Sequence, residues 1–216
     1  MAKKIWLVGI GMGNRDTLTI GAWNILKNCD CLIGAQRMLD AFPELTCRRF
    51  AATAPEKIAA YLQEHPEFQT IGVVFSGDVG FYSGAKKLRS LFPEHLIEEC
   101  CGISTVAYLC AKLHTPWEDV RLVSAHGQAC NLAGEVRTHE KVFVLAGKVS
   151  AQELCKALCR AGLGGVTVSV GERLSYPEEA ITTGPAERLS GQTFDPLSAL
   201  LIQNPAPLSN DTLAFG

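Results

Sequence analysis

The chain has 216 residues, enough for one large domain or two small ones, and 47% of them are apolar, which is ample for a buried core. The formal net charge of −2 gives no indication of a nucleic-acid partner. Glycines interrupt the apolar stretch after the N-terminal lysines, which is not typical of a signal peptide. A membrane-spanning helix needs about 20 apolar residues, and no apolar run approaches that length. We therefore expect a cytoplasmic protein without a signal peptide or membrane association.

Strand-like runs alternate with amphipathic helical stretches along the first half, a pattern typical of an α/β fold. Thr53 and Glu56 have the spacing of a capping box at the start of one helix. The predicted strands cover residues 4–10, 30–35 and 70–76. The predicted helices cover residues 17–29, 37–42, the stretch from the capping box to Tyr61, the stretch after the third strand to Leu91, and residues 104–113.

The segment "HTPWEDV" (114–120) breaks this alternation with Pro116. We therefore predict an N-terminal α/β domain (1–115), a linker (116–120) and a C-terminal α/β domain (121–204). Ser150 and Glu153 have the spacing of a second capping box. Strands at 121–126, 141–147 and 165–172, with the runs "EAITTG" and "SALLIQN", are expected to form a smaller second sheet.

The nine cysteines do not have the spacing of a metal site or a disulfide framework. No C-x-x-C pair occurs, and the number is odd. We expect most of them to be reduced, buried thiols and predict no protein metal site.

The first glycine-rich loop, "VGIGMGNRD" (8–16), resembles a dinucleotide fingerprint only in part. Asn14 stands where the third glycine belongs, and the expected acidic residue about 20 positions further on is missing. The loop is therefore either a turn near another ligand or a purely structural turn.

The second loop, "FSGDVGFYSGAKKL" (75–88), is not a Walker A loop, and Asp78 at its centre would repel a phosphate. A carboxylate here suits ribose hydroxyls, an ammonium group or a cationic ligand. The alternative is that Asp78 caps a helix that starts near Phe81.

Three further segments have both a structural and a functional interpretation. Ser104 or Thr105 in "CGISTVAYL" can cap a helix or contact a ligand, and His126 in "SAHGQ" is expected at a strand end. Glu172 and Tyr176 can be ligand contacts or parts of a hairpin-like loop.

Taken together and in order, the motifs resemble the tetrapyrrole methylase family of S-adenosylmethionine-dependent enzymes over residues 4–203. They are "VGIGMG", "SGDVGFYS", "CGISTVAYL", "SAHG", "VFVLAGK" and "VGERLSYPEEAITTGP". The fourth and sixth look most like the branch that methylates C5 of (cobalt-)precorrin-7 in cobalamin biosynthesis, in its stand-alone form. Members that act on uroporphyrinogen-III, a diphthamide precursor or ribosomal RNA remain the alternative.

The resemblance implies two α/β domains with S-adenosylmethionine in the cleft between them, and usually a homodimer. Proline is usual in the family at the positions of Met12, Val79 and Cys101. S-Adenosylmethionine carries a sulfonium, an ammonium and a ribose but no phosphate, so an aspartate in the second loop fits it. The cofactor positions carried over are Met12, Ser76, Gly77, Asp78, Phe81, Ser104, Thr105, Ala146 and Leu174.

The resemblance also implies a tetrapyrrole substrate, whose carboxylate arms require cations. Arg15 and Arg37 lie near predicted strand ends and are candidates, although either can be a solvated surface arginine. His126 is the candidate base if the macrocycle must lose a proton. Cobalt would arrive inside the substrate, and a separate C15-methyltransferase/decarboxylase is a possible partner. A nicotinamide oxidoreductase and a non-catalytic partner protein are the competing functions.

Overall fold

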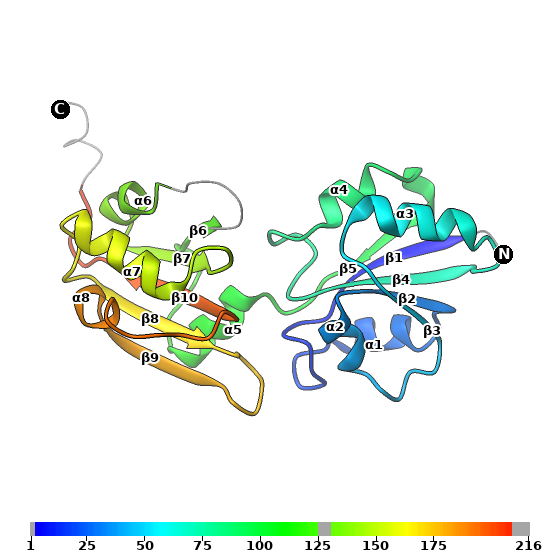
Figure 1. The fold of residues 1–216 in the computed structure, drawn as a ribbon, viewed down its shortest axis with the longest axis horizontal. Coiled ribbons are helices and arrows are strands. Elements are labelled where there is room, and N and C mark those ends of the chain that lie inside the picture. The colour runs from blue at the N-terminus through cyan, green and yellow to red at the C-terminus, as the bar shows by residue number, and fades with distance from the viewer. Residues whose placement is uncertain (1–2, 125–130, 209–216) are drawn as a thin grey trace. The chain divides into compact units, whose positions relative to one another are not determined.

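The structure is a computed structural model that describes residues 3–124 and 131–208. The chain divides into two compact units, Met1–Thr105 and Val106–Gly216. Each unit has its own five-stranded sheet with helices packed against it (Figure 1).

The sheet of the first unit is entirely parallel, with strand order β3-β2-β4-β1-β5. All five strands therefore point the same way, and the loops that follow them leave from one edge, which we call the C-terminal edge. The strands are β1 (Lys4–Gly9), β2 (Cys31–Gly34), β3 (Arg48–Ala51), β4 (Thr70–Phe75) and β5 (Ile97–Cys100).

Helices cover both faces of this sheet because side chains alternate along its strands. On β1, Ile5 and Leu7 pack on one face, under α3 and α4, and Val8 packs on the other, under α1 and α2 (Figure 1). The helices are α1 (Ile20–Leu26), α2 (Gln36–Asp40), α3 (Pro55–Glu64) and α4 (Ala85–Arg89), with a short 3-10 turn η1 (Glu94–Leu96).

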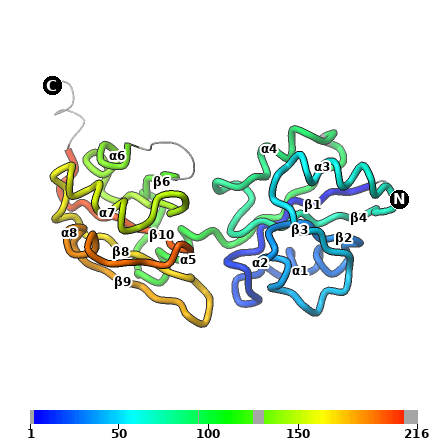
Figure 2. The backbone as a smooth tube through the Cα atoms, in the orientation of Figure 1, coloured from blue at the N-terminus to red at the C-terminus, as the bar shows by residue number. Residues whose placement is uncertain are grey.

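The sheet of the second unit is mixed, with order β6-β7-β10-β8-β9, and the pairing of β6 with β7 is its parallel one. The chain reverses direction between β8 and β9 (Figure 2). The strands are β6 (Arg121–Ser124), β7 (Lys141–Leu145), β8 (Thr167–Glu172), β9 (Ala180–Pro185) and β10 (Ser198–Gln203). The helices are α5 (Thr105–Lys112), α6 (Leu132–Thr138), α7 (Ala151–Arg160) and α8 (Ala186–Leu189).

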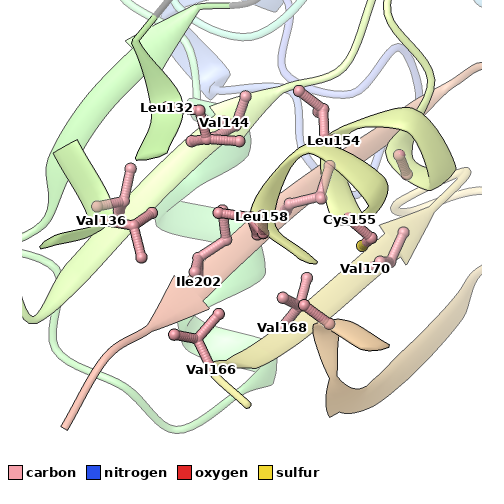
Figure 3. Packing of buried hydrophobic residues seen from close by; sticks show 14 of the residues in the cluster. Leu132, Val136, Val144, Leu154, Cys155, Leu158, Val166, Val168, Val170 and Ile202 are labelled. Carbon is pink, nitrogen blue, oxygen red and sulfur yellow. The ribbon is translucent and has the colours of Figure 1, made fainter. Parts of the chain in front are cut away.

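The core of the second unit is an aliphatic layer between α7 and the sheet. Leu154, Cys155 and Leu158 of α7 face Val168 and Val170 of β8 (Figure 3). Ser150 caps α7: its hydroxyl accepts from the Glu153 N–H, and the Glu153 carboxylate accepts from the Ser150 N–H. The predicted capping box at this helix is confirmed.

The predicted α/β class is confirmed, with two differences in detail. The second sheet has as many strands as the first and is not the smaller one. The capping box at Thr53 and Glu56 is wrong: α3 begins at Pro55 with Ala54 as its N-cap residue, and Glu56 pairs with Lys87.

The division after Thr105 places the rest of α5 and the segment 114–120 in the second unit. The domain bounds 1–115 and 121–204, with the linker 116–120, stay a prediction. Within residues 3–124 and 131–208, no helix is both long and apolar enough to cross a bilayer.

Candidate functional site

Three loops at the C-terminal edge of the first sheet touch one another through their backbones. They follow β1 (residues 10–19), β4 (residues 76–84) and β5 (residues 101–104). Gly11 and Gly77 exchange hydrogen bonds, with N···O distances of 3.2 and 2.6 Å. A Cβ atom on Gly102 would lie 2.2 Å from the Gly77 oxygen and 2.6 Å from the Gly9 carbonyl carbon. Glycine is required here because no side chain fits between the loops.

Asp78 ties two of these loops together. Its Oδ1 atom accepts from the N–H of Gly80 at 2.8 Å, and its Oδ2 atom accepts from the N–H of Gly102 at 2.9 Å. The helix-cap interpretation of Asp78 is wrong, because α4 begins at Ala85 with Gly84 as its N-cap residue. Each carboxylate oxygen retains a second lone pair. The negative charge is therefore held in place by backbone donors and can still accept from a ligand.

The remaining predicted residues of the second and third loops lie beside Asp78. Gly77 has a φ of +72° and faces Ser104 and Thr105, with 3.8 Å between its ideal Cβ position and the Thr105 Oγ1 atom. Phe81 packs edge-on against Tyr82, with ring centroids 4.9 Å apart. Tyr82 has a φ of +48°, a conformation that is uncommon for a bulky residue. The second loop is therefore a tightly folded segment.

Asn14 and Thr17 hold the first loop. The Asn14 side-chain oxygen accepts from both the N–H and the hydroxyl of Thr17, at 3.1 and 2.8 Å. The Thr17 hydroxyl oxygen accepts from the N–H of Met12 at 2.9 Å. Asn14, the residue that breaks the dinucleotide fingerprint, is thus the residue that shapes this loop and places Met12.

The two candidate arginines both lie near the C-terminal edge but make different contacts. Arg15 is 2.6 Å from Glu44 and stacks over Trp23, with 3.9 Å between its guanidinium carbon and the ring centroid. Arg37, in the first turn of α2, donates to the carbonyl of Met12 at 3.4 Å. Arg15 is itself part of the first loop, and Arg37 contacts that loop at Met12, a predicted cofactor position.

In the second unit, the two predicted residues, Ala146 and Leu174, lie at the same end of the strands of the mixed sheet. The N–H of Ala146, just after β7, donates to the Ser198 carbonyl at 3.2 Å. Ser198 begins β10 and is paired with Glu172 at the end of β8, two residues before Leu174. Ala146 and Leu174 are only 8% and 5% exposed.

Ser198 at this end of the strands is a residue that the sequence analysis missed. Its hydroxyl is buried and has no hydrogen-bond partner within the described ranges of the chain. A buried hydroxyl without a partner is costly, and such groups often await a water or a ligand. The sequence signal was weak, because a serine before "ALLI" simply reads as the start of a strand.

Of the remaining predictions, His126 lies outside the described residues. Glu172 accepts from the N–H of Asp195 at 2.7 Å, and Tyr176 lies in the turn between β8 and β9, so the hairpin interpretation of this loop is confirmed. Arg173 and Ser175, on either side of Leu174, have φ values of +45° and +69°.

The cysteines in the described ranges are all free thiols. Burial raises the pKa of Cys29 to about 12 and that of Cys155 to about 11, so both stay protonated. Cys101 is exposed, unlike the core thiols that we expected. In the same ranges, His, Cys, Asp and Glu residues form no group of three suited to hold a metal ion.

Comparison with known proteins agrees with this fold. The sequence model of the tetrapyrrole (corrin/porphyrin) methylases matches residues 4–190. A Methanocaldococcus jannaschii protein named "probable cobalt-precorrin-7 C(5)-methyltransferase" is 28% identical over 207 residues, covering 92% of this chain and 97% of that protein.

Two solved structures show the same fold. The precorrin-6Y methylase of Archaeoglobus fulgidus has a TM-score of 0.71 at 21% identity, covering 93% of this chain and 98% of that one. The uroporphyrin-III C-methyltransferase of Thermus thermophilus, solved with S-adenosylhomocysteine, has a TM-score of 0.75 at 18% identity, covering 93% and 97%.

The two α/β units with these loops, together with the sequence match and the two similar structures, define a methyltransferase fold. The chain belongs to the tetrapyrrole methylases. The sequence analysis predicted that the chain belongs to this family and is a methyltransferase, and both predictions are confirmed.

Proposed function

We propose that this protein transfers a methyl group from S-adenosylmethionine to C5 of (cobalt-)precorrin-7 in cobalamin biosynthesis. The proposal is supported by membership of the family and by the M. jannaschii relative, which aligns over nearly its whole length. The structural observation that best supports the proposal is that backbone N–H groups fix the carboxylate of Asp78 among the glycine-rich loops. Such a site suits a cationic donor with hydroxyl groups and disfavours a phosphate.

The residues present fit S-adenosylmethionine, which supplies a methyl group on a sulfonium. Asp78 would accept from an ammonium or hydroxyl group. In the second unit, the buried Ser198 hydroxyl still requires a partner, and the Ala146 N–H donates to the Ser198 carbonyl beside it. We assign the cofactor contacts to Met12, Ser76, Gly77, Asp78, Phe81, Ser104, Thr105, Ala146 and Leu174.

In this mechanism the protein positions the two reactants and excludes water. S-Adenosylmethionine would supply an activated methyl group whose leaving group is a neutral thioether, so no covalent enzyme intermediate is required. Arg37, which donates to the Met12 carbonyl, and Arg15, which is paired with Glu44, would bind carboxylate arms of the tetrapyrrole. His126 would remove the proton if the methylated carbon must lose one.

We also propose that the protein works in the cytoplasm as a homodimer, and that a separate C15-methyltransferase/decarboxylase can receive its product. The family resemblance supports these proposals. Sedimentation of the purified chain, alone and with that partner, measures both associations. A monomer across the micromolar range would contradict the homodimer.

The test of the function is methyl transfer with labelled S-adenosylmethionine to precorrin-7, with and without cobalt, followed by mass and NMR analysis of the product. We expect one added methyl group at C5. Uroporphyrinogen-III and NADH serve as controls. Turnover of uroporphyrinogen-III in place of precorrin-7 would assign the chain to another branch, and binding of NADH without S-adenosylhomocysteine would contradict a methyltransferase.

A further inference from the structure

The turn that contains Leu174 has an unusual backbone. The N–H of Tyr176 donates to the carbonyl of Arg173 at 2.9 Å, which closes a four-residue turn with Leu174 and Ser175 at its centre. Ser175 has a φ of +69° at the third position of this turn, where glycine is normally found. Arg173 has a φ of +45°. Non-glycine residues keep such conformations only where their surroundings enforce them.

Glu179 is the group that enforces this turn from within the hairpin loop. Its Oε2 atom accepts from the N–H of Ser175 at 2.6 Å and from the Tyr108 hydroxyl at 2.7 Å. Its Oε1 atom lies 2.8 Å from the Lys112 ammonium. Tyr108 and Lys112 are one turn apart on α5, so one carboxylate joins the strained turn to a helix far away in the sequence.

Glu179 remains ionised in this setting. Its side chain is 19% exposed, and burial acts to raise its pKa. The hydrogen bonds from Lys112, the Ser175 N–H and Tyr108 more than offset burial, so the pKa lies below its ordinary value. The carboxylate is therefore a strong acceptor for all three donors at neutral pH.

The turn holds the side chain of Leu174 in one packed position. The Leu174 side chain packs with Leu109 of α5 over Gly171, where a Cβ atom would lie 2.8 Å from Leu174 Cδ2 and 2.9 Å from Leu109 Cδ1. Within the described part of the chain, the backbone N–H and C=O of Leu174 make no hydrogen bond. The strained turn thus holds an anchored side chain and two polar backbone groups that make no hydrogen bond in the described ranges.

We infer that Glu179 is a positioning residue for the cofactor: by bracing Ser175 against Tyr108 and Lys112, it keeps the Leu174 backbone in the conformation that binds S-adenosylmethionine. Glu179 itself does not touch the cofactor. The inference rests on the proposed function, because it takes Leu174 as a cofactor contact.

The test is calorimetric titration of the full chain with S-adenosylhomocysteine. We expect Glu179→Ala to raise the Kd about ten-fold, because the binding-competent turn would then be populated only in a fraction of molecules. Adding Ser175→Gly to Glu179→Ala should recover at least about three-fold of that loss, since glycine adopts the positive φ without a brace. A merely structural glutamate would not give this rescue.

The matched control is Glu135→Ala. Glu135 is also a partly buried glutamate of the second unit, paired with Arg121 at 2.8 Å, and it lies on α6 rather than in the hairpin loop. Glu135→Ala should lower the melting temperature about as much as Glu179→Ala does. Its Kd for S-adenosylhomocysteine should stay within two-fold of the wild-type value. A Kd for Glu179→Ala within two-fold of the wild type, or an equal loss in Glu135→Ala, would overturn the inference.

If Glu179→Ala does not fold, the double variant Tyr108→Phe with Lys112→Met removes two donors, keeps the carboxylate and is read in the same way. Failure of the proposed function is distinguishable, because the wild type itself would then not bind S-adenosylhomocysteine.

Discussion

The Oδ2 atom of Asp78 accepts a hydrogen bond of 2.9 Å from the backbone N–H of Gly102, and this contact joins the loops after β4 and β5. The same carboxylate accepts from Gly80 within its own loop. Asp78 therefore serves the loop structure and the proposed ligand site at once, so its replacement has to be read against a control that separates the two.

Replacing Asp78 with alanine should weaken the binding of S-adenosylhomocysteine about ten-fold or more, because hydrogen bonds to a charged group contribute about 1.5–3 kcal/mol. The melting temperature should fall as well, since two backbone donors lose their acceptor. Calorimetry and thermal unfolding measure the two effects.

Asp30→Ala is the matched control for this prediction. Its Oδ2 atom accepts from the N–H groups of Gln69 and Thr70, both at 2.8 Å, at the opposite edge of the same sheet. It should lower the melting temperature and leave affinity unchanged. Equal affinity in wild type and Asp78→Ala would remove Asp78 from the site.

Replacing Gly102 with alanine should separate the three loops. The new Cβ atom would meet the Gly77 carbonyl oxygen, which is backbone and cannot rotate away. We expect a loss of stability of about 2 kcal/mol or more and no detectable cofactor binding. Gly21→Ala in α1, where the Cβ atom would have only ordinary contacts at 3.9 Å, should be neutral or stabilising. Urea unfolding distinguishes the two, and a stable, binding Gly102→Ala would contradict the observed packing.

Replacing Ser198 with alanine tests whether its buried hydroxyl awaits a ligand. Without a ligand, the variant should be as stable as the wild type or more stable, because an unpartnered polar group is removed. The Kd for S-adenosylhomocysteine should nevertheless rise about three-fold to ten-fold, in line with about 1 kcal/mol for one hydrogen bond. Ser169→Ala, which breaks a 2.8 Å bond to Thr183, should instead reduce stability and leave the Kd unchanged. A Ser198→Ala variant that is less stable than the wild type but has an unchanged Kd would assign Ser198 a structural role.

The ion pair between Lys141 and Asp119 should make stability depend on acidity. The Lys141 ammonium lies 2.8 and 2.9 Å from the two carboxylate oxygens, and its hydrogen bond lowers the pKa of Asp119 from an ordinary value of 3.8. Because the folded-state pKa is the lower one, the pair stabilises fully above that ordinary value. Its contribution is lost as the pH falls through the folded-state pKa.

The corresponding experiment is urea unfolding between about pH 5 and about pH 3. The free energy of unfolding should fall less steeply for Lys141→Met than for the wild type. Lys4→Met removes an exposed pair with Glu98 and should leave the slope unchanged. Identical slopes for the wild type and Lys141→Met would show that the pair adds no pH dependence.

Thiol labelling of the native protein should distinguish Cys101 from the core cysteines. Cys101 is exposed, whereas burial raises the pKa of Cys29 to about 12 and that of Cys31 to about 11. Little thiolate forms at such sites near neutral pH. Peptide mapping after a brief treatment should find Cys101 modified and Cys29 and Cys31 intact, and Cys101→Ser should lose the fast labelling of that peptide. Rapid labelling of Cys29 would contradict its burial.

The alternation of strands and helices could be predicted because most elements carry their own periodicity. The capping box at Ser150 is similarly local and was correct. The one at Thr53 failed because Pro55 takes the first helical position and leaves Ala54, not Thr53, at the cap. Strand β3 was missed since "RRFA" is half charged, and its position at the sheet edge allows those side chains to remain partly exposed.

The site could be predicted only in part. The glycines and Asp78 stand out in the sequence, but the bond from Asp78 reaches Gly102, 24 residues further along the chain. The role of Glu179 depends on α5, which lies 71 residues before it at Tyr108. Such contacts are created by the fold and have no local signature.

The strand order of the first unit has a consequence for how the protein is made. β1 leaves the ribosome first, yet its two neighbours are β4 and β5, residues 70–75 and 97–100. β1 therefore stays unpaired until β4 has been synthesised, and its second side stays unpaired until β5 has been synthesised. Such distant pairing slows folding. Gly102 can meet Gly9 and Gly77 only after β5 has docked, so the three-loop edge is the last part of this unit to acquire its shape. A nascent chain that stalls before β5 would expose one side of β1 to chaperones or to another chain.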